Sequence, residues 1–253
     1  TSDSLGELRW FNEFGVLLSS ERLPAPGTTL DWSKNGATVA VSLRNTDQRE
    51  IMLFDGYSRR RLATLPSKYA DAAISPDGKY LVTATQASST IEIWDRHGTM
   101  LKALEQSSFI TSFEISETGD KLLAGGLDGS VQVWAFPSGE QLAVLPAKGS
   151  NIRDISVTHD GRYSFVLDSK GTVFVWDLLR YRYAAHKSTD SEASRVLSDP
   201  SKTFLVTMTA SKFYVRPIGE LSQQVLRSNL LRELACRIPK SVREQTVSTL
   251  QCP

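Results

Sequence analysis

The chain contains few of the residues that build covalent or metal frameworks. It has two cysteines and three histidines among 253 residues. Cys236 and Cys252 lie close to the end, where they either form one bridge across the tail or stay as free thiols. Two cysteines in a chain of this length do not make a disulfide framework, and three scattered histidines give little support to a zinc site. We therefore expect a fold held by its apolar core, with no cofactor.

Long apolar runs and a strong net charge are also missing. No stretch of about 18 apolar residues occurs, and the first residues lack the basic and apolar regions of a signal peptide. The net charge of +1 does not provide the positive field of a dedicated nucleic-acid-binding protein. These absences predict a cytoplasmic protein without a membrane partner, and they argue against nucleic acid as the main ligand.

Sequence motifs that carry catalysis are absent as well. The chain has no P-loop, GxGxxG, HExxH, GxSxG or CxxC motif. Gly125, Gly126 and Gly129 lie in an expected strand and its turn, so they do not form a phosphate-binding loop before a helix. We therefore expect that the chain is not an enzyme.

What the sequence does contain is a repeated phrase that ends in an aromatic residue. TIEIWD, SVQVWA and TVFVWD place Trp94, Trp134 and Trp176 at spacings of 40 and 42 residues. Phe54 precedes Trp94 by 40 residues, and the same series continues back to Trp10 and forward to Arg216. Alternating apolar residues rich in valine, isoleucine and tryptophan are typical of half-buried strands.

Turn sequences recur with the same period. SKNG, SPDG, SETG and THDG end at glycines 36, 78, 119 and 161, and each is followed by another alternating run such as KYLVTAT. Glycine, asparagine and aspartate favour tight turns because they tolerate positive φ or bond their own backbone. Four short strands in each 40-residue unit predict an all-β fold, a β-propeller.

The repeat resembles the WD40 family over residues 5–227. Trp94-Asp95 and Trp176-Asp177 match the family dipeptide, whereas Phe54-Asp55 and Trp134-Ala135 match in part and Arg216-Pro217 departs from it. The Gly-His pair of the family is missing throughout. The resemblance implies four-stranded blades and a non-catalytic role as a scaffold or sensor that recognises a partner.

The strand pattern places the propeller at residues 1–227. Five full blades are expected at about 28–66, 68–105, 109–146, 151–187 and 192–227, after two strands of another blade in LRWF and VLLSSERL. Such an array must close to cover its edges. Either upstream sequence or another polypeptide supplies the missing strands, or residues 8–20 pair with the final blade.

The tail at residues 228–253 has a different pattern. Leu230, Leu231, Leu234 and Ile238 recur at helical spacing, Ser228 suits an N-cap, and a second short helix is expected at 240–250. The tail therefore predicts a short helical cap. Leu-Ala-Cys at residues 234–236, followed by the terminal Cys-Pro at 252–253, resembles the tail of WD40 regions in large bacterial multidomain signalling proteins, which implies an effector domain elsewhere in a longer polypeptide.

The WD40 resemblance also implies where a partner binds. In that family, partners use the face formed by the loops between second and third strands and between blades. In this chain, that face corresponds to eight candidate residues: Arg44, Arg49, Lys68, Tyr69, Phe109, Lys148, Asn151 and Lys170. Arginines and exposed aromatics are the residue types that anchor interfaces. The mixed charge favours a protein or peptide partner, although Phe109 fits equally well as a buried residue at the start of a strand.

The sequence is also compatible with three alternative roles. The partner is alternatively another segment of the same larger protein that completes the propeller. The chain is alternatively the structural half of a split or cleaved propeller with no site of its own. A weaker alternative is nucleic-acid or anion binding through the segment RYRYAAH, which contains His186.

Overall fold

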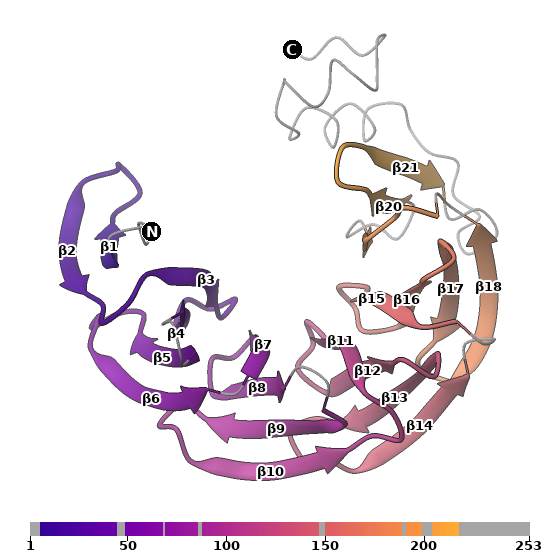
Figure 1. Ribbon diagram of the computed structural model, residues 1–253, viewed down its shortest axis with the longest axis horizontal. Helices are drawn as coiled ribbons and strands as arrows, with labels where there is room; N and C mark the ends of the chain where they lie inside the picture. Colours follow the sequence, from indigo (N-terminus) through magenta and orange to yellow (C-terminus); the bar gives the residue numbers. More distant parts are fainter. Residues whose placement is uncertain are drawn as a thin grey trace, which may run out of the picture.

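The computed structural model describes residues 6–44, 49–67, 69–85, 88–146, 150–188, 191–198 and 204–217. Within these ranges every regular element is a strand, and the strands form six antiparallel sheets. Figure 1 shows the sheets side by side along an open arc. The all-β prediction is confirmed. The described strands do not close a ring, and the predicted helical cap lies outside the described residues.

Four sheets have four strands each, hydrogen-bonded in chain order. Their strands are β3 (Gly27–Trp32), β4 (Thr38–Arg44), β5 (Arg49–Asp55) and β6 (Arg61–Ser67); β7 (Tyr69–Ile74), β8 (Tyr80–Thr85), β9 (Thr90–Asp95) and β10 (Met100–Glu105); β11 (Ile110–Ile115), β12 (Lys121–Gly126), β13 (Ser130–Ala135) and β14 (Gln141–Pro146); and β15 (Ile152–Val157), β16 (Tyr163–Asp168), β17 (Thr172–Asp177) and β18 (Arg182–Ser188). These sheets match the first four predicted blades.

The two sheets at the ends of the arc are smaller. The first contains β1 (Glu7–Phe11) and β2 (Leu17–Arg22), and the last contains β19 (Arg195–Ser198), β20 (Phe204–Met208) and β21 (Phe213–Pro217). Arg216 pairs with Leu205 as Trp134 pairs with Leu122, so it occupies the predicted place in the series. The fourth strand expected for the last sheet falls after residue 217, outside the described residues.

The predicted turns explain why the first and second strands of each full sheet pair as a hairpin. Gly36, Gly78, Gly119 and Gly161 all have φ close to +70°, which glycine adopts without a steric penalty. In the turn between β7 and β8, the Ser75 hydroxyl donates to Asp77 and accepts from the N–H of Tyr80. These side-chain bonds fix the hairpin independently of the rest of the sheet.

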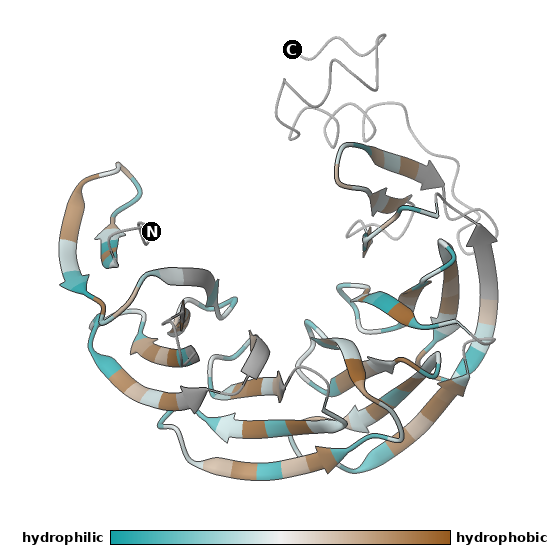
Figure 2. Cartoon of the chain, in the orientation of Figure 1, coloured by the Kyte–Doolittle hydropathy of each residue, from teal (hydrophilic) through white to brown (hydrophobic). Residues whose placement is uncertain are grey.

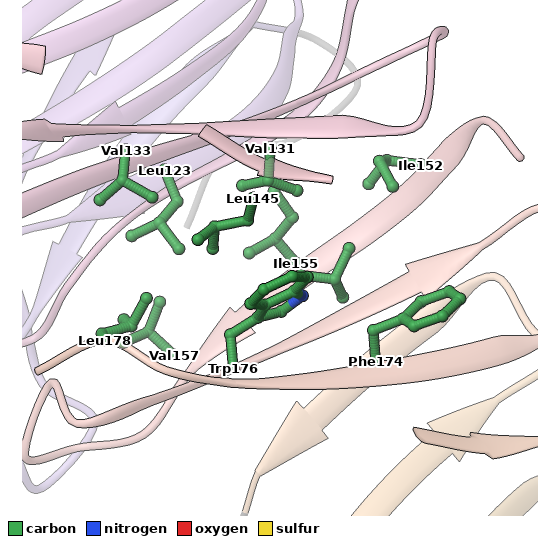
Figure 3. Packing of buried hydrophobic residues seen from close by; sticks show 11 residues of the cluster. Leu123, Val131, Val133, Leu145, Ile152, Ile155, Val157, Phe174, Trp176 and Leu178 are labelled. Atoms are coloured by element: carbon green, nitrogen blue, oxygen red, sulfur yellow. The ribbon is translucent and has the colours of Figure 1, made fainter. Parts of the chain in front are cut away.

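The repeated aromatic residues fill the space between neighbouring sheets. Phe54, Trp94, Trp134 and Trp176 are all 9% exposed or less. Figure 3 shows Trp176 of the fourth full sheet in one buried cluster with Leu145 and Val131 of the third. The alternation along the strands is visible in Figure 2. Burying an aromatic side chain of this size contributes roughly 2–3 kcal/mol, so these residues hold the sheets together.

Carboxylates on first strands add polar links between sheets. Asp31 accepts a hydrogen bond from the N–H of Ile74 at 3.1 Å, and Glu114 accepts one from the N–H of Val157 at 3.2 Å. A second type of link joins Arg96 to Asp55 at 2.5 Å, with both side chains about one quarter exposed. These links connect residues about 40 positions apart, so no local pattern predicts them.

One part of the predicted register is wrong. Trp10 was expected in the place of the repeated aromatic, but Phe11 occupies it. The register shifts between Trp10 and Phe11, as it does between Val133 and Trp134 and between Val175 and Trp176. Trp10 instead points to the next sheet and packs edge-on against Phe54, with ring centroids 6.2 Å apart. Two adjacent aromatics made the choice ambiguous, and only the strand pairing resolves it.

Candidate interaction face

The sheet topology determines which loops share an end of the array. Because strands run antiparallel in chain order, the loop between second and third strands lies at the same end as the connection to the next sheet. Two backbone hydrogen bonds show this directly. The carbonyl oxygen of Ser89 accepts from the N–H of Gln106 at 2.7 Å, and that of Ser88 accepts from the N–H of Ile110 at 2.9 Å. We call this end of the sheets the loop face.

Phe109 lies on the loop face and is half exposed, at 50%. The alternative that it is buried at the start of β11 is therefore wrong. Its carbonyl oxygen accepts a hydrogen bond from the N–H of Leu127 at 3.0 Å, and Leu127 is 43% exposed. The backbone bond holds two exposed apolar residues from different loops close together. Such a pair offers an anchor for an apolar side chain of a partner.

Hydroxyl and carboxylate groups border this apolar pair. The Ser107 hydroxyl donates to Asp128 at 3.2 Å and accepts from the Gln132 amide at 3.2 Å, and the Ser108 hydroxyl accepts from the N–H of Asp128. Partial burial would raise the pKa of Asp128, but hydrogen bonds from Ser130 and Ser107 outweigh it and lower that pKa. Asp128 is therefore a fixed negative charge beside Phe109 and Leu127.

The fourth full sheet repeats this arrangement with polar residues. The carbonyl oxygen of Asn151 accepts from the N–H of Ser169 at 2.8 Å, as that of Phe109 does from Leu127. Asn151 and Lys170 are both exposed, and the N–H of Lys170 donates to Asp168 at 2.9 Å. The loop face thus changes from apolar and acidic on the third full sheet to polar and basic on the fourth.

For three other candidate residues, Arg44, Arg49 and Tyr69, the structure gives the position of the backbone. Arg44 and Arg49 pair across β4 and β5, and Tyr69 pairs with Thr85 across β7 and β8. These pairings place their backbones at the loop-face ends of the strands. Lys68 and Lys148 lie outside the described residues. Sequence reasoning missed Leu127, because a single apolar residue in a loop carries no periodic signal.

The described residues show little sign of a catalytic or metal-binding site. No group of three or more histidine, cysteine, aspartate or glutamate side chains in the described ranges is arranged to hold a metal ion. The described residues contain no helix that is long and apolar enough to span a membrane. In the RYRY segment, Tyr183 lies on the outer strand β18 and packs edge-on against Trp176 at 5.6 Å, although 45% of it stays exposed.

Comparison with known proteins supports the repeat assignment. The family model described as "WD domain, G-beta repeat" matches residues 62–95 and 98–135. These two segments carry WD40 repeats. Each runs from the fourth strand of one sheet through the third strand of the next, which is one strand out of phase with the sheets themselves.

Several known proteins are similar to parts of the chain. The chain is 33% identical over 153 residues to the WD repeat-containing protein 26 homolog of Arabidopsis thaliana, a match that covers 57% of the chain and 25% of that protein. It is 24% identical over 147 residues to the target of rapamycin complex subunit wat1 of Schizosaccharomyces pombe, covering 56% of the chain and 43% of that protein. Mouse jouberin matches at 24% identity over 159 residues, 58% of the chain and 15% of that protein. The chain therefore spans less than half of each of these relatives.

Proposed function

We propose that the chain is a non-catalytic interaction module that binds a protein or peptide partner through its loop face. The observation that carries this proposal is the pair Phe109–Leu127, two exposed apolar side chains held together beside the charged Asp128. A neighbouring polar and basic area around Asn151 and Lys170 extends the surface. An apolar centre with a polar border is the arrangement of specific protein interfaces.

The relatives support a role in assemblies. The relative wat1 is named as a subunit of the target of rapamycin complex, and the two matched segments of this chain carry WD40 repeats. We infer that this chain likewise serves as a scaffold within a larger protein or complex, with any effector function carried by other residues. The bacterial signalling context and the cytoplasmic location expected from the sequence stay predictions, and the relatives compared above come from eukaryotes.

The test compares the partner proteins that bind the purified wild-type chain with those that bind each purified variant. Phe109→Ala and Leu127→Ala should each lose partners that the wild-type chain retains, and Arg49→Glu should weaken the same partners. Leu179→Ala is the matched control, since Leu179 is 65% exposed in the turn between β17 and β18, at the opposite end of its sheet. Loss of the same partners with Leu179→Ala, or retention of all partners by both loop-face variants, would place the binding site elsewhere.

A further inference from the structure

The loop between β12 and β13 differs from the equivalent loop between β16 and β17 in where it carries charge. In the first loop, the N–H of Gly129 donates to the carbonyl oxygen of Gly126 at 3.1 Å. In the second, the N–H of Gly171 donates to that of Asp168 at the same distance, so Gly126 is the counterpart of Asp168. Asp168 is 3% exposed, and its carboxylate accepts from the N–H of Lys170. The second loop is thus held from the inside by a buried carboxylate.

In the loop of the third full sheet, the carboxylate lies on the outside instead. Asp128, the counterpart of Lys170 in the same alignment, is exposed. It accepts from the N–H of Ser130 at 3.0 Å and from the hydroxyl of Ser130 at 2.8 Å. None of the ion pairs formed between described residues involves Asp128. The loop therefore presents a negative charge that is fixed in position and is not neutralised by a described cation.

The carboxylate of Asp128 and the amide of Gln106 come together at Gly126, because that residue has no side chain. A Cβ atom on Gly126 would lie 2.6 Å from Nε2 of Gln106 and 2.6 Å from Oδ1 of Asp128. Gln106 is 6% exposed, and in the described structure neither polar atom of its amide has a hydrogen-bond partner. Unsatisfied buried amides are rare and costly, so this one favours the binding of a hydrogen-bonding group beside Asp128.

The apolar pair of the loop face lies next to this charge. Leu127 directly precedes Asp128, and its backbone bond to Phe109 keeps the two exposed apolar residues on the same part of the surface. The hydroxyl of Ser107 donates to Asp128 at 3.2 Å from the same side. A segment that covers this area must therefore bring an apolar side chain and a cation that donates hydrogen bonds close together.

We propose that the loop face recognises a segment of its partner in which an arginine adjoins an aliphatic residue. The guanidinium pairs with Asp128, beside the amide of Gln106, and the aliphatic side chain packs on Phe109 and Leu127. A guanidinium suits this place better than an ammonium, because it presents several donors in a plane and pairs with a carboxylate through two of them. This inference rests on the function proposed above, and it adds the chemistry of the partner.

Two terminally blocked hexapeptides are the probes, one with a central leucine–arginine pair and one with a central leucine–glutamate pair. Each is added to the whole chain at up to about 5 mM and followed by NMR saturation transfer. The wild type should bind the arginine peptide at least about ten-fold more tightly, and salt should weaken that binding. Asp128→Asn should remove the preference while keeping an oxygen acceptor for Ser130, and Asp128→Lys should reverse it.

Asp77→Asn is the matched control for the loss of charge. Asp77 is also an exposed carboxylate in a turn, and it accepts from the N–H of Lys79 at 3.1 Å, but it lies at the end of the sheets opposite the loop face. This variant should bind both peptides as the wild type does. Gly126→Ala should weaken binding of the arginine peptide, because the added Cβ displaces Gln106 or Asp128.

Three results with the peptides would overturn the proposal. The first is equal or undetectable binding of the two peptides by the wild type. The second is an unchanged preference for arginine in Asp128→Asn or in Asp128→Lys, in variants that melt near the wild-type temperature. The third is equal binding of a peptide with lysine in place of arginine, which would contradict recognition of a guanidinium.

The retained partner proteins separate this inference from the proposed function. If Phe109→Ala loses partners that both Asp128 variants keep, the loop face binds its partner without a basic residue, and this inference alone is wrong. If Phe109→Ala and both Asp128 variants keep every partner, the proposed function is wrong as well. Loss of the same partners by Phe109→Ala and by Asp128→Lys, but not by Asp77→Asn, is the result that the proposal predicts.

Discussion

Glu114 gives the sharpest quantitative prediction, because it is a carboxyl group held in a joint between two sheets. Its Oε1 accepts the N–H of Val157 at 3.2 Å. Burial raises the pKa of Glu114 to about 8, from an ordinary value of 4.5, and the charges of Asp154 and Glu117 add to the effect. At pH 7 the folded protein therefore keeps this carboxyl largely protonated, whereas the unfolded chain ionises it.

The sign of the effect on stability follows from the proton binding. Between pH 4.5 and 8 the folded state binds more protons at this site than the unfolded state, so the contribution of Glu114 to stability falls as pH rises through that range. At pH 7, which is 2.5 units above 4.5, a factor of about 1.36 kcal/mol per unit gives a loss of at most about 3 kcal/mol. Glu114 keeps some contact with solvent, so this figure is an upper limit.

Glu114→Gln removes the titration but keeps an oxygen acceptor for Val157. The variant should match the wild type near pH 4.5 and become more stable by about 1–3 kcal/mol at pH 7. Glu114→Ala removes the acceptor as well, so it should be less stable than the glutamine variant by about 1 kcal/mol or more. The assay is urea unfolding followed by tryptophan fluorescence at several pH values from 4.5 to 8.

A stability difference between Glu114→Gln and the wild type that does not grow as pH rises would contradict a raised pKa of Glu114 in the folded protein. Equal stability of the alanine and glutamine variants would mean that the hydrogen bond to Val157 contributes nothing. A pH-dependent change in the slope of the unfolding curve would show instead that the variant alters the unfolded state.

Three further substitutions test the packing and the links between sheets, all by urea unfolding. Trp134→Ala should cost about 3–5 kcal/mol, because the side chain is 3% exposed between two sheets, and a loss below about 1 kcal/mol would contradict its place in the core. Arg96→Ala should cost about 1–3 kcal/mol by leaving Asp55 without its partner in the next sheet, and an effect that disappears at high salt would mean that the pair acts only at the surface. Gly98→Ala should cost about 1 kcal/mol or more, because φ is +83° there and a Cβ atom would lie 2.9 Å from that of Ala63; unchanged stability would show that the turn can adjust.

The strand pattern could be predicted from the sequence because it depends on local chemistry. The glycines that end the SPDG-type turns have the positive φ that such turns require, and the alternating runs between them became strands. The repeated aromatics are buried between sheets wherever a neighbouring sheet is described on both sides. Local periodicity was sufficient for these features, since each depends on residues within one hairpin.

Features that depend on contacts between sheets could not be predicted in the same way. The hydrogen bonds that Asp31 accepts from the N–H of Ile74 and Glu114 accepts from the N–H of Val157 join residues about 40 positions apart, and no motif marks them. The pair Phe109–Leu127 forms because a backbone bond joins two loops, although Phe109 itself was a candidate. Trp10 and Phe11 could be told apart only by the strand register, which moves the repeated aromatic by one residue.

The most direct test of the account is the dissociation constant of a retained partner, measured with purified components for the wild type, Phe109→Ala and Leu179→Ala. If the loop face is the binding site, Phe109→Ala should weaken binding by at least ten-fold, which corresponds to about 1.4 kcal/mol, and Leu179→Ala should leave it unchanged. Equal dissociation constants for all three chains, each folded as judged by its melting curve, would contradict the assignment of partner recognition to the Phe109–Leu127 pair.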